Sequence, residues 1–178
     1  MTFSVWIYLY AENASGVQSV FCMGQNSSQY RGMLLVNRSL QYHHATQNGV
    51  QTLVVPNPMP LNQWVHVVAS NRARRMHLWI DGVKVASKKN DSPTLDLSEN
   101  PLFVGCNHSS FVSSFSQGIE GLMSDFRFIP RYVQDDEIAV LRASGPSLVR
   151  SDDYSYQLSS LVYSVHKAAK ISHCLISD

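Results

Sequence analysis

Apolar and polar residues alternate most clearly along residues 64–70 and again along residues 75–80, as in β-strands with one buried face. The polar residues 71–74 join these two runs as a turn. Asp81-Gly82 follows the second run, and this dipeptide between apolar strands favours a two-residue hairpin because glycine adopts a positive φ without steric cost. We therefore predict three consecutive antiparallel strands, the last one at residues 83–87.

Seven other runs also have the composition of β-strands, at residues 3–10, 19–23, 32–36, 40–44, 51–55, 102–105 and 122–129. Turn-forming residues separate them at short intervals, which is typical of an antiparallel sandwich. Pro56, Pro58 and Pro60 follow one run, and we expect that strand to end before them because proline gives no amide proton to a β-ladder. A short extended piece is expected at residues 94–97. The predicted fold is all-β, an antiparallel jelly-roll β-sandwich.

Two helices are predicted after the strands. Acidic residues open a short helix near 134–143, and Gly145-Pro146 ends it. Apolar residues at three- and four-residue spacing then predict an amphipathic C-terminal helix near 155–172. The chain thus divides into a sandwich at residues 1–145 and a C-terminal extension at residues 146–178. The second helix either packs on its own sandwich or docks to a partner through its apolar residues Leu158, Leu161, Val162 and Val165.

The composition excludes several functional classes. The formal charge is +1, with 14 basic and 13 acidic residues, so no global field favours nucleic acid or an anionic membrane. The local cluster Arg72, Arg74 and Arg75 is either a solvated turn or a phosphate or polyanion site. No run reaches the roughly 18–20 apolar residues of a membrane-spanning helix. No export signal follows Met1, so we expect an intracellular location if Met1 is the natural start and an extracellular one if the chain is an excised domain.

The three cysteines, Cys22, Cys106 and Cys174, are too few and too scattered to indicate a disulfide framework or a zinc site. We therefore expect them to be buried free thiols.

The residues around the predicted hairpins resemble a known family. Trp64-Val-His-Val-Val-Ala and Leu78-Trp-Ile-Asp-Gly-Val-Lys-Val-Ala-Ser look like the central signature of laminin-G-like domains of the concanavalin A-like superfamily. Residues 3–7, 101–105 and 121–129 resemble the early, later and closing strands of that family, in the expected order. The resemblance covers roughly residues 2–143. It implies the fold more than the function, because this superfold includes lectins, adhesion modules, enzymes and scaffolds.

One feature departs from the family. Its members usually have a strand pair before the early strand, and no such segment precedes Phe3 here. We therefore expect an uncovered sheet edge beside Phe3. An uncovered edge attracts another strand, so residues 146–156, the C-terminal helix or a partner would cover it.

No catalytic residue is predicted. Related sandwich glycosidases use two carboxylates spaced along one strand, and no such pair occurs in the sequence. Asp135-Asp136-Glu137 is explained by the helix start and Asp81 by the hairpin turn. Asp125 resembles a recurring polar position of the family, where it makes either a structural hydrogen bond or a ligand contact.

The histidines and acidic residues do not predict a metal site. His43 and His44 are adjacent, so on a strand they point to opposite faces. His66 and His77 lie on neighbouring predicted strands, and we expect a structural histidine at position 66. No cofactor is expected, with calcium as an alternative that would suit an adhesion-type relative. The loop that contains Asp91 and Asp96 is the candidate for calcium, and the other interpretation is that both carboxylates are simply solvated.

The candidate ligand-binding residues are aromatic and lie at alternating positions, which would form a concave face for sugar stacking: Tyr8, Tyr10, Tyr42 and Trp79. For Trp79 the alternative of a core residue is favoured, because a tryptophan in a sandwich normally packs. Two hypotheses follow. The first is a non-catalytic binding module that recognises a glycan or a protein through a sheet face or rim loops. The alternative is an accessory or scaffold subunit of a larger intracellular complex, docking through an exposed sheet edge and the C-terminal helix. An unusual hydrolase is a third option, disfavoured by the missing carboxylate pair.

Overall fold

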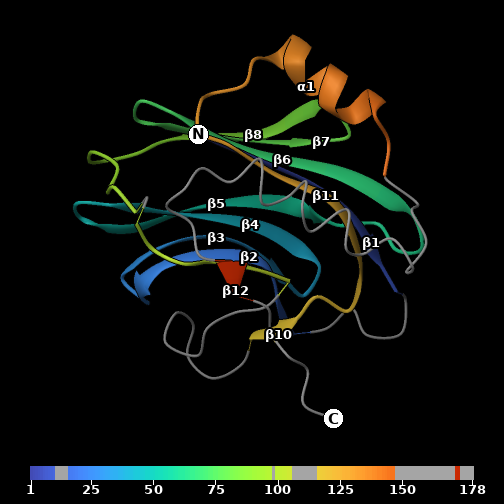
Figure 1. The fold of residues 1–178 in the computed structure, drawn as a ribbon, viewed down its shortest axis with the longest axis horizontal. Helices are drawn as coiled ribbons and strands as arrows, with labels where there is room; N and C mark the ends of the chain where they lie inside the picture. Colours follow the sequence, from blue (N-terminus) through green and yellow to red (C-terminus); the bar gives the residue numbers. More distant parts are fainter. Residues whose placement is uncertain (11–15, 98, 106–115, 147–170, 173–178) are drawn as a thin grey trace.

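Two β-sheets pack face to face in the computed structural model, which describes residues 1–10, 16–97, 99–105, 116–146 and 171–172 (Figure 1). The first sheet has the order β11-β1-β6-β7-β8, with the bounds Gly121–Ile129, Thr2–Leu9, Trp64–Arg72, Arg75–Ile80 and Val83–Lys89. The second has the order β12-β9-β2-β3-β4-β5, with the bounds Ile171–Ser172, Leu102–Val104, Val17–Asn26, Gln29–Val36, Ser39–Thr46 and Gly49–Pro58. β10 (Ser116–Gly118) pairs with β2. The predicted antiparallel β-sandwich is confirmed.

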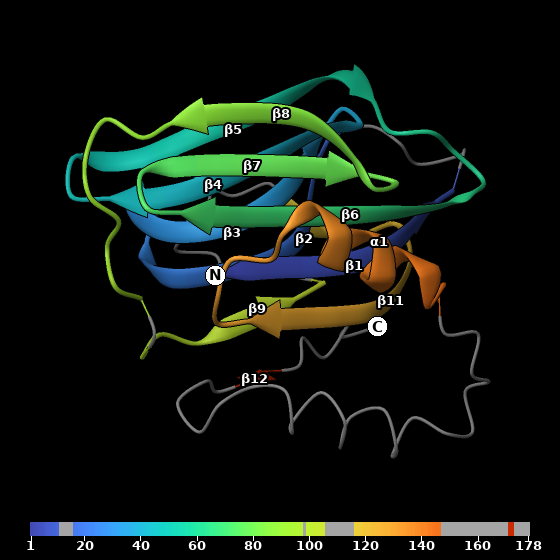
Figure 2. The ribbon, with the colours of Figure 1, turned by 90° about the horizontal axis from the view of Figure 1, so that it is seen from above.

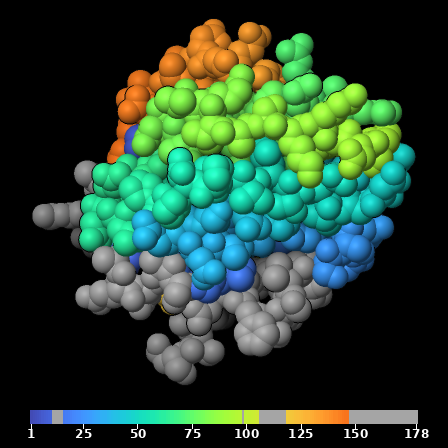
Figure 3. All heavy atoms as spheres, turned by 180° about the vertical axis from the view of Figure 1, so that it is seen from behind, coloured from blue at the N-terminus to red at the C-terminus, as the bar shows by residue number. Residues whose placement is uncertain are grey.

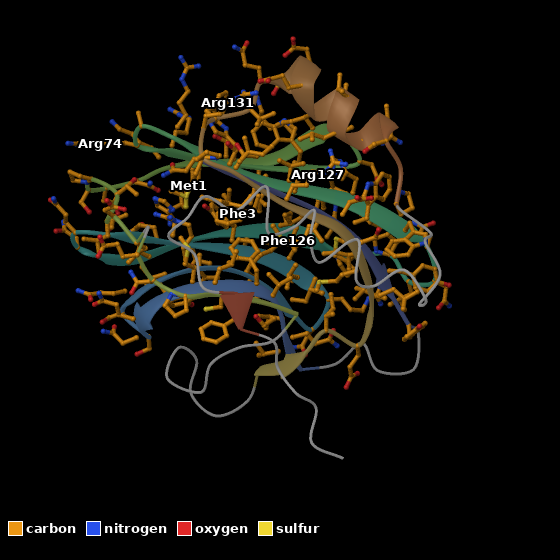
Figure 4. All side chains as sticks on the ribbon, in the orientation of Figure 1. Met1, Phe3, Arg74, Phe126, Arg127 and Arg131 are labelled. Carbon is orange, nitrogen blue, oxygen red and sulfur yellow. The ribbon has the colours of Figure 1, made fainter. Side chains whose placement is uncertain are left out.

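The core lies between the two sheets because the apolar residues of β1 alternate with outward-facing ones. Phe3, Val5 and Ile7 are completely buried. The Phe3 ring stacks on Phe21 of β2 with ring centres 4.1 Å apart, and Phe126 of β11 lies 6.4 Å from it (Figure 4). Full burial of each such side chain contributes about 1.5–3 kcal/mol as an upper estimate. This contact therefore joins the two sheets at their centre.

The predicted hairpins are confirmed, with one turn tighter than expected. Asp81 and Gly82 have φ values of 49° and 80°, the positive values that a type I′ turn requires at both positions. Between β6 and β7 the ladder continues as far as the pair Arg72 and Arg75, so only Ala73 and Arg74 form the turn.

The expectation that β5 would end before its prolines was wrong. β5 runs to Pro58 and includes Pro56. β5 lies at the edge of its sheet, where a missing amide proton costs no ladder hydrogen bond on the open side. The expected extended piece at residues 94–97 is reduced to an isolated bridge between Thr46 and Thr94.

The expected open edge beside Phe3 is also corrected. Phe3 pairs with Phe128 of β11 on one side and with Ala69 of β6 on the other. β11 and β8 are the outer strands of the first sheet among the described residues, as Figure 2 shows. Along one side of the molecule β8 lies beside β5 of the second sheet (Figure 3).

The predicted short helix is confirmed as α1 (Asp135–Ala143), which lies on the outer face of the first sheet (Figures 1 and 2). The Glu137 carboxylate accepts a hydrogen bond from the backbone amide of Gln134 (2.9 Å), which stabilises the first turn. Ile138 is fully buried against the sheet, in a cluster with Trp79 and Val133. The helix thereby covers the middle of this outer face.

Most of the predicted C-terminal helix, including the docking residues Leu158, Leu161, Val162 and Val165, lies outside the described residues. Ile171 and Ser172, at its predicted end, form strand β12 instead and pair with β9. The proposed boundary between residues 145 and 146 stays a prediction. Within the described ranges, no helix is long and apolar enough to cross a membrane.

Candidate functional site

The four aromatic residues predicted to bind a ligand lie in three different places. Tyr42 is completely buried in the core, opposite Met33. Trp79 is 1% exposed beneath α1, where its Nε1 donates a hydrogen bond to Asp135 Oδ1 (3.1 Å). Only Tyr8 and Tyr10 reach the surface together, with ring centres 5.7 Å apart. Burial closes the Tyr42 and Trp79 rings to a ligand in this arrangement, and ligand contact by Tyr8 and Tyr10 stays a prediction.

Trp64 joins these two tyrosines in one aromatic surface. The first residue of β6, Trp64 pairs with Tyr8 of β1, and the two rings meet edge to face with centres 5.7 Å apart. Tyr10 is 44% exposed, and Leu122, opposite Tyr8 on β11, is 46% exposed. We call Tyr8, Tyr10 and Trp64 the aromatic platform. The sequence analysis named Trp64 only as part of the family signature, and the signal for its surface role is its position at the start of a strand, after exposed Asn62 and Gln63.

Polar groups lie on the same face of the sheet, two residues along the strands from the platform. The Trp6 ring packs on the His66 ring with centres 5.0 Å apart, and His66 Nε2 lies 2.9 Å from Ser4 Oγ. Trp6 Nε1 and His66 Nδ1 are buried, and neither has a hydrogen-bond partner in the structure. His66 is buried and contacts Ser4 through Nε2 while its Nδ1 is unpaired, and its structural role stays a prediction.

Burial, more than the neighbouring charges, determines the protonation state of His66. Burial lowers the pKa of His66 to about 4; Asp81 opposes this shift, while Arg127 and Arg142 add to it. The Asp81 carboxylate accepts a hydrogen bond from the His66 amide (3.0 Å), so Asp81 stabilises both its own turn and strand β6. His66 is consequently neutral at pH 7 and acts as a hydrogen-bonding ring rather than a cation.

A bulge in β11 places an ion pair at the rim of this region. Asp125 has a φ of 51°, and the pairing of β1 with β11 shifts between Ser4 and Trp6. Such bulges redirect side chains next to functional sites. Asp125 Oδ1 lies 3.7 Å from Arg127 Nη2, and the two side chains are 25% and 38% exposed. Arg127 also donates a hydrogen bond to Ser144 Oγ (3.4 Å), just after α1.

His43 and His44 of β4 make hydrogen-bonding contacts within the second sheet and the sandwich interior. His43 and His44 face opposite sides of β4, as expected. On the outer face, the Tyr30 hydroxyl lies 2.6 Å from His43 Nδ1. In the interior, Arg31 Nε donates to His44 Nδ1 (3.0 Å), and the Asn71 amide lies 2.6 Å from His44 Nε2. Burial lowers the pKa of His43 to about 4 and that of His44 to about 3.

The described residues contain no group of three or more histidine, cysteine or acidic side chains that could hold a metal ion. Asp96 lines a surface hollow of about 360 Å³ with Gln25, Glu99 and Asn100. Asp91 is not among the lining residues of that hollow. Calcium binding stays an untested prediction. Cys22 is a buried free thiol, as expected, and burial raises its pKa to about 12.

Solved structures with a similar fold include modules that bind sugars. The CBM40 module of the Ruminococcus gnavus IT-sialidase, solved with α2,3-sialyllactose, aligns with a TM-score of 0.60 at 14% identity, covering 79% of this chain and 80% of that one. Domain 4 of an extracellular arabinanase from Geobacillus stearothermophilus, solved with arabinotriose, aligns with a TM-score of 0.63 at 15% identity, covering 79% and 65%.

A heptameric SAP-like pentraxin from Limulus polyphemus aligns with a TM-score of 0.56 at 14% identity, covering 84% of this chain and 72% of that one. Comparison with curated protein sequences finds no match. The model of the concanavalin A-like lectin/glucanase superfamily matches residues 1–139, in agreement with the sandwich described above. The chain belongs to the concanavalin A-like lectin/glucanase superfamily.

Proposed function

We propose that this domain is a non-catalytic binding module and that its ligand is a glycan bound at the aromatic platform. The observation that carries the proposal is the contiguous surface of Tyr8, Tyr10 and Trp64, which ends at the exposed ring of Tyr10. Aromatic rings provide rigid apolar faces at low entropic cost, and ligand sites combine such faces with a few polar groups. The glycan-bound structures with the same fold support this class of ligand.

The partly exposed Asp125 and Arg127 supply polar groups near His66, further along the same sheet from the platform. A carboxylate accepts hydrogen bonds from sugar hydroxyls, and a guanidinium donates them. The pair lies near His66, so a ligand that extends from the rings along β1 toward His66 would meet it.

Structural contacts of several carboxylates support binding without catalysis. Asp81 accepts from the His66 amide, Asp135 accepts from Trp79, and Glu137 pairs with Arg131. A general acid or base has to be within hydrogen-bond reach of its substrate. These three carboxylates instead hold a turn, a tryptophan and a helix terminus.

The test is glycan-array binding of the full chain and of two variants, Tyr10→Ala and Trp64→Ala. Each variant should weaken binding of an array hit by about tenfold, because a central aromatic contact contributes about 1–2 kcal/mol. Val140→Ala is the matched control, since Val140 is 71% exposed on α1. Equal binding by all three variants and the parent chain would contradict the platform.

A second candidate function, an accessory or scaffold subunit, is favoured by the exposed edge strand β8. Val83 is 65% exposed and Val85 is 38% exposed on this strand. Exposed edge strands pair readily with other chains. Affinity purification from an extract of the native source, with the parent chain and the variant Val83→Lys/Val85→Lys as baits, tests this role. A partner that is retained by the parent and lost by the variant supports docking at β8, whereas equal retention argues against it.

A further inference from the structure

Three cations form a row across the end of the first sheet, away from the platform. Arg72 of β6 pairs directly with Arg75 of β7, and Arg75 pairs directly with Lys89 of β8. Directly paired residues share a face of the sheet, and all three side chains are exposed. Arg74 occupies the adjoining turn and lies at the outer end of the β6–β7 hairpin in Figure 4. We call Arg72, Arg75 and Lys89 the cationic row.

This arrangement works against the stability of the sheet. Like charges directly opposite on neighbouring strands repel each other. Among the described residues, the ion pairs are Lys84 with Asp135, Arg127 with Asp125 and Arg131 with Glu137, and none of them includes a member of the row. The chain as a whole carries a formal charge of only +1, so the concentration of positive charge is local.

Contacts around the row hold it in place. The Arg72 guanidinium lies over the Tyr132 ring, 5.3 Å from its centre, in a cation–π contact. The backbone amide of Asn90 donates to the Arg74 carbonyl (2.6 Å) and fixes the turn to the end of β8. Ala73 in that turn has a φ of 51°, a conformation that non-glycine residues rarely adopt. The cations are therefore presented by a fixed backbone.

We propose that the cationic row binds a carboxylate-rich segment of a partner protein. The adjacent surface shows the chemistry that would complete it: Arg131, next to Tyr132, pairs through both of its terminal nitrogens with the Glu137 carboxylate. The planar guanidinium fork fits a carboxylate in this two-point geometry. Arg72 and Arg75 lack such a partner in the described structure, and carboxylates of an incoming acidic segment would supply it.

Two other classes of polyanion fit the row less well. Stable binding to a membrane surface takes a second signal beside a cluster of cations, such as inserted apolar side chains or a lipid anchor. Among the described residues, the exposed large apolar side chains are Tyr10, Val54, Val83, Val85, Leu122 and Val140, and none of these lies in the β6–β7 turn. Affinity for a nucleic acid grows with the number of phosphates that a protein neutralises, and the row crosses three strands and spans only about 10 Å. A sulfated polysaccharide is distinguished in the test below.

The experiment measures binding of a fluorescein-labelled peptide with alternating glutamate and glycine residues to the full chain, by fluorescence anisotropy in 50 mM NaCl. Arg72→Gln/Arg75→Gln should weaken binding by about fivefold or more, because each exposed ion pair contributes modestly and two are lost. The matched control is Lys84→Gln/Arg142→Gln, which removes the same charge at the other end of the sheet. It should bind within about twofold of the parent, and 300 mM NaCl should weaken binding to the parent by screening.

The proposal is overturned if the folded parent does not bind the peptide, or if both double variants lose affinity equally. Binding of heparin with the same dependence on Arg72 and Arg75, without binding of the peptide, would also overturn it and assign the row to a sulfated polysaccharide. The inference is independent of the glycan site. Trp64→Ala should retain peptide binding, so failure of one proposal is distinguishable from failure of the other.

Discussion

The two ends of the outer face of the first sheet carry opposite kinds of surface, although the same strand β6 contributes to both. At one end Trp64 packs edge to face on Tyr8, so the side chains stabilise one another. At the other end Arg72 stands directly opposite Arg75, so the side chains repel. α1 lies between the two ends on Trp79 and divides the face. The aromatic end is thus stable without a ligand, whereas the cationic end is costly without one.

The largest expected effect comes from removing the support of the dividing helix. Trp79→Ala should lower the free energy of unfolding by about 3–5 kcal/mol, because it deletes a large buried ring and the hydrogen bond to Asp135. Urea unfolding followed by tryptophan fluorescence and circular dichroism measures the change. A loss below about 1 kcal/mol would show that Trp79 does not anchor α1.

Acid should destabilise the aromatic end through His66, whose pKa is about 4 when folded. An unfolded histidine has a pKa near 6.5 and so binds more protons than the folded one between these values. The contribution of neutral His66 is fully present above about pH 6.5 and is lost as the pH falls toward 4, at up to about 1.4 kcal/mol per pH unit. Urea midpoints at pH 7, 6, 5 and 4 should fall less steeply for His66→Gln than for the parent.

The parent and His66→Gln also carry the buried His44, so His44→Gln provides the comparison from the interior of the sandwich. Its folded pKa of about 3 predicts a pH dependence of the same sign. If the urea midpoint depends on pH in the same way for the parent and both variants, these histidines are not protonated differently in the folded and unfolded chains.

Salt should affect the ligand affinities of the two ends differently. Stacking on the platform depends little on ionic strength, whereas exposed charges are screened within about 10 Å at 0.1 M salt. Raising NaCl from 50 to 300 mM should leave the affinity for an array-identified neutral glycan within about twofold and weaken acidic-peptide binding severalfold. Titration calorimetry at both salt concentrations checks this, and equal salt dependence of both ligands would argue against two chemically distinct sites.

The smallest expected effect is a gain in stability at the cationic row. Arg75→Gln removes the repulsion with both Arg72 and Lys89, and should raise the free energy of unfolding by about 0.5 kcal/mol. Urea unfolding in 20 mM NaCl measures this gain, with Arg142→Gln as the control at the other end of the sheet. A stability loss in Arg75→Gln would mean that the row has a structural role.

Local signals in the sequence were sufficient to predict the hairpins. Asp81-Gly82 determines its turn through positive φ at both residues, and the capping interaction of Glu137 lies within one turn of α1. Both depend on residues close in the chain. By contrast, an open edge was expected beside Phe3 because no strand pair precedes it, and the strand that covers it, with Phe128, is distant in sequence.

The candidate site was only partly predictable for the same reason. Tyr8 and Tyr42 both alternate with their neighbours, but alternation does not indicate which face of a strand is buried. The pairing with Met33 turns Tyr42 inward, and the pairing with Trp64 leaves Tyr8 on the outer face. The burial of Trp79 depended on where α1 would pack, which the sequence did not indicate. Each of these outcomes comes from contacts between distant segments.

The central claim is that the aromatic platform is the glycan-binding surface of this domain. The most direct measurement is a glycan array probed in parallel with the parent chain, Trp64→Ala and Arg72→Gln/Arg75→Gln, after circular dichroism confirms that all three are folded. We predict at least one glycan that binds the parent and the arginine variant and is lost by Trp64→Ala. Absence of any bound glycan, or hits that Trp64→Ala retains unchanged, would contradict the claim.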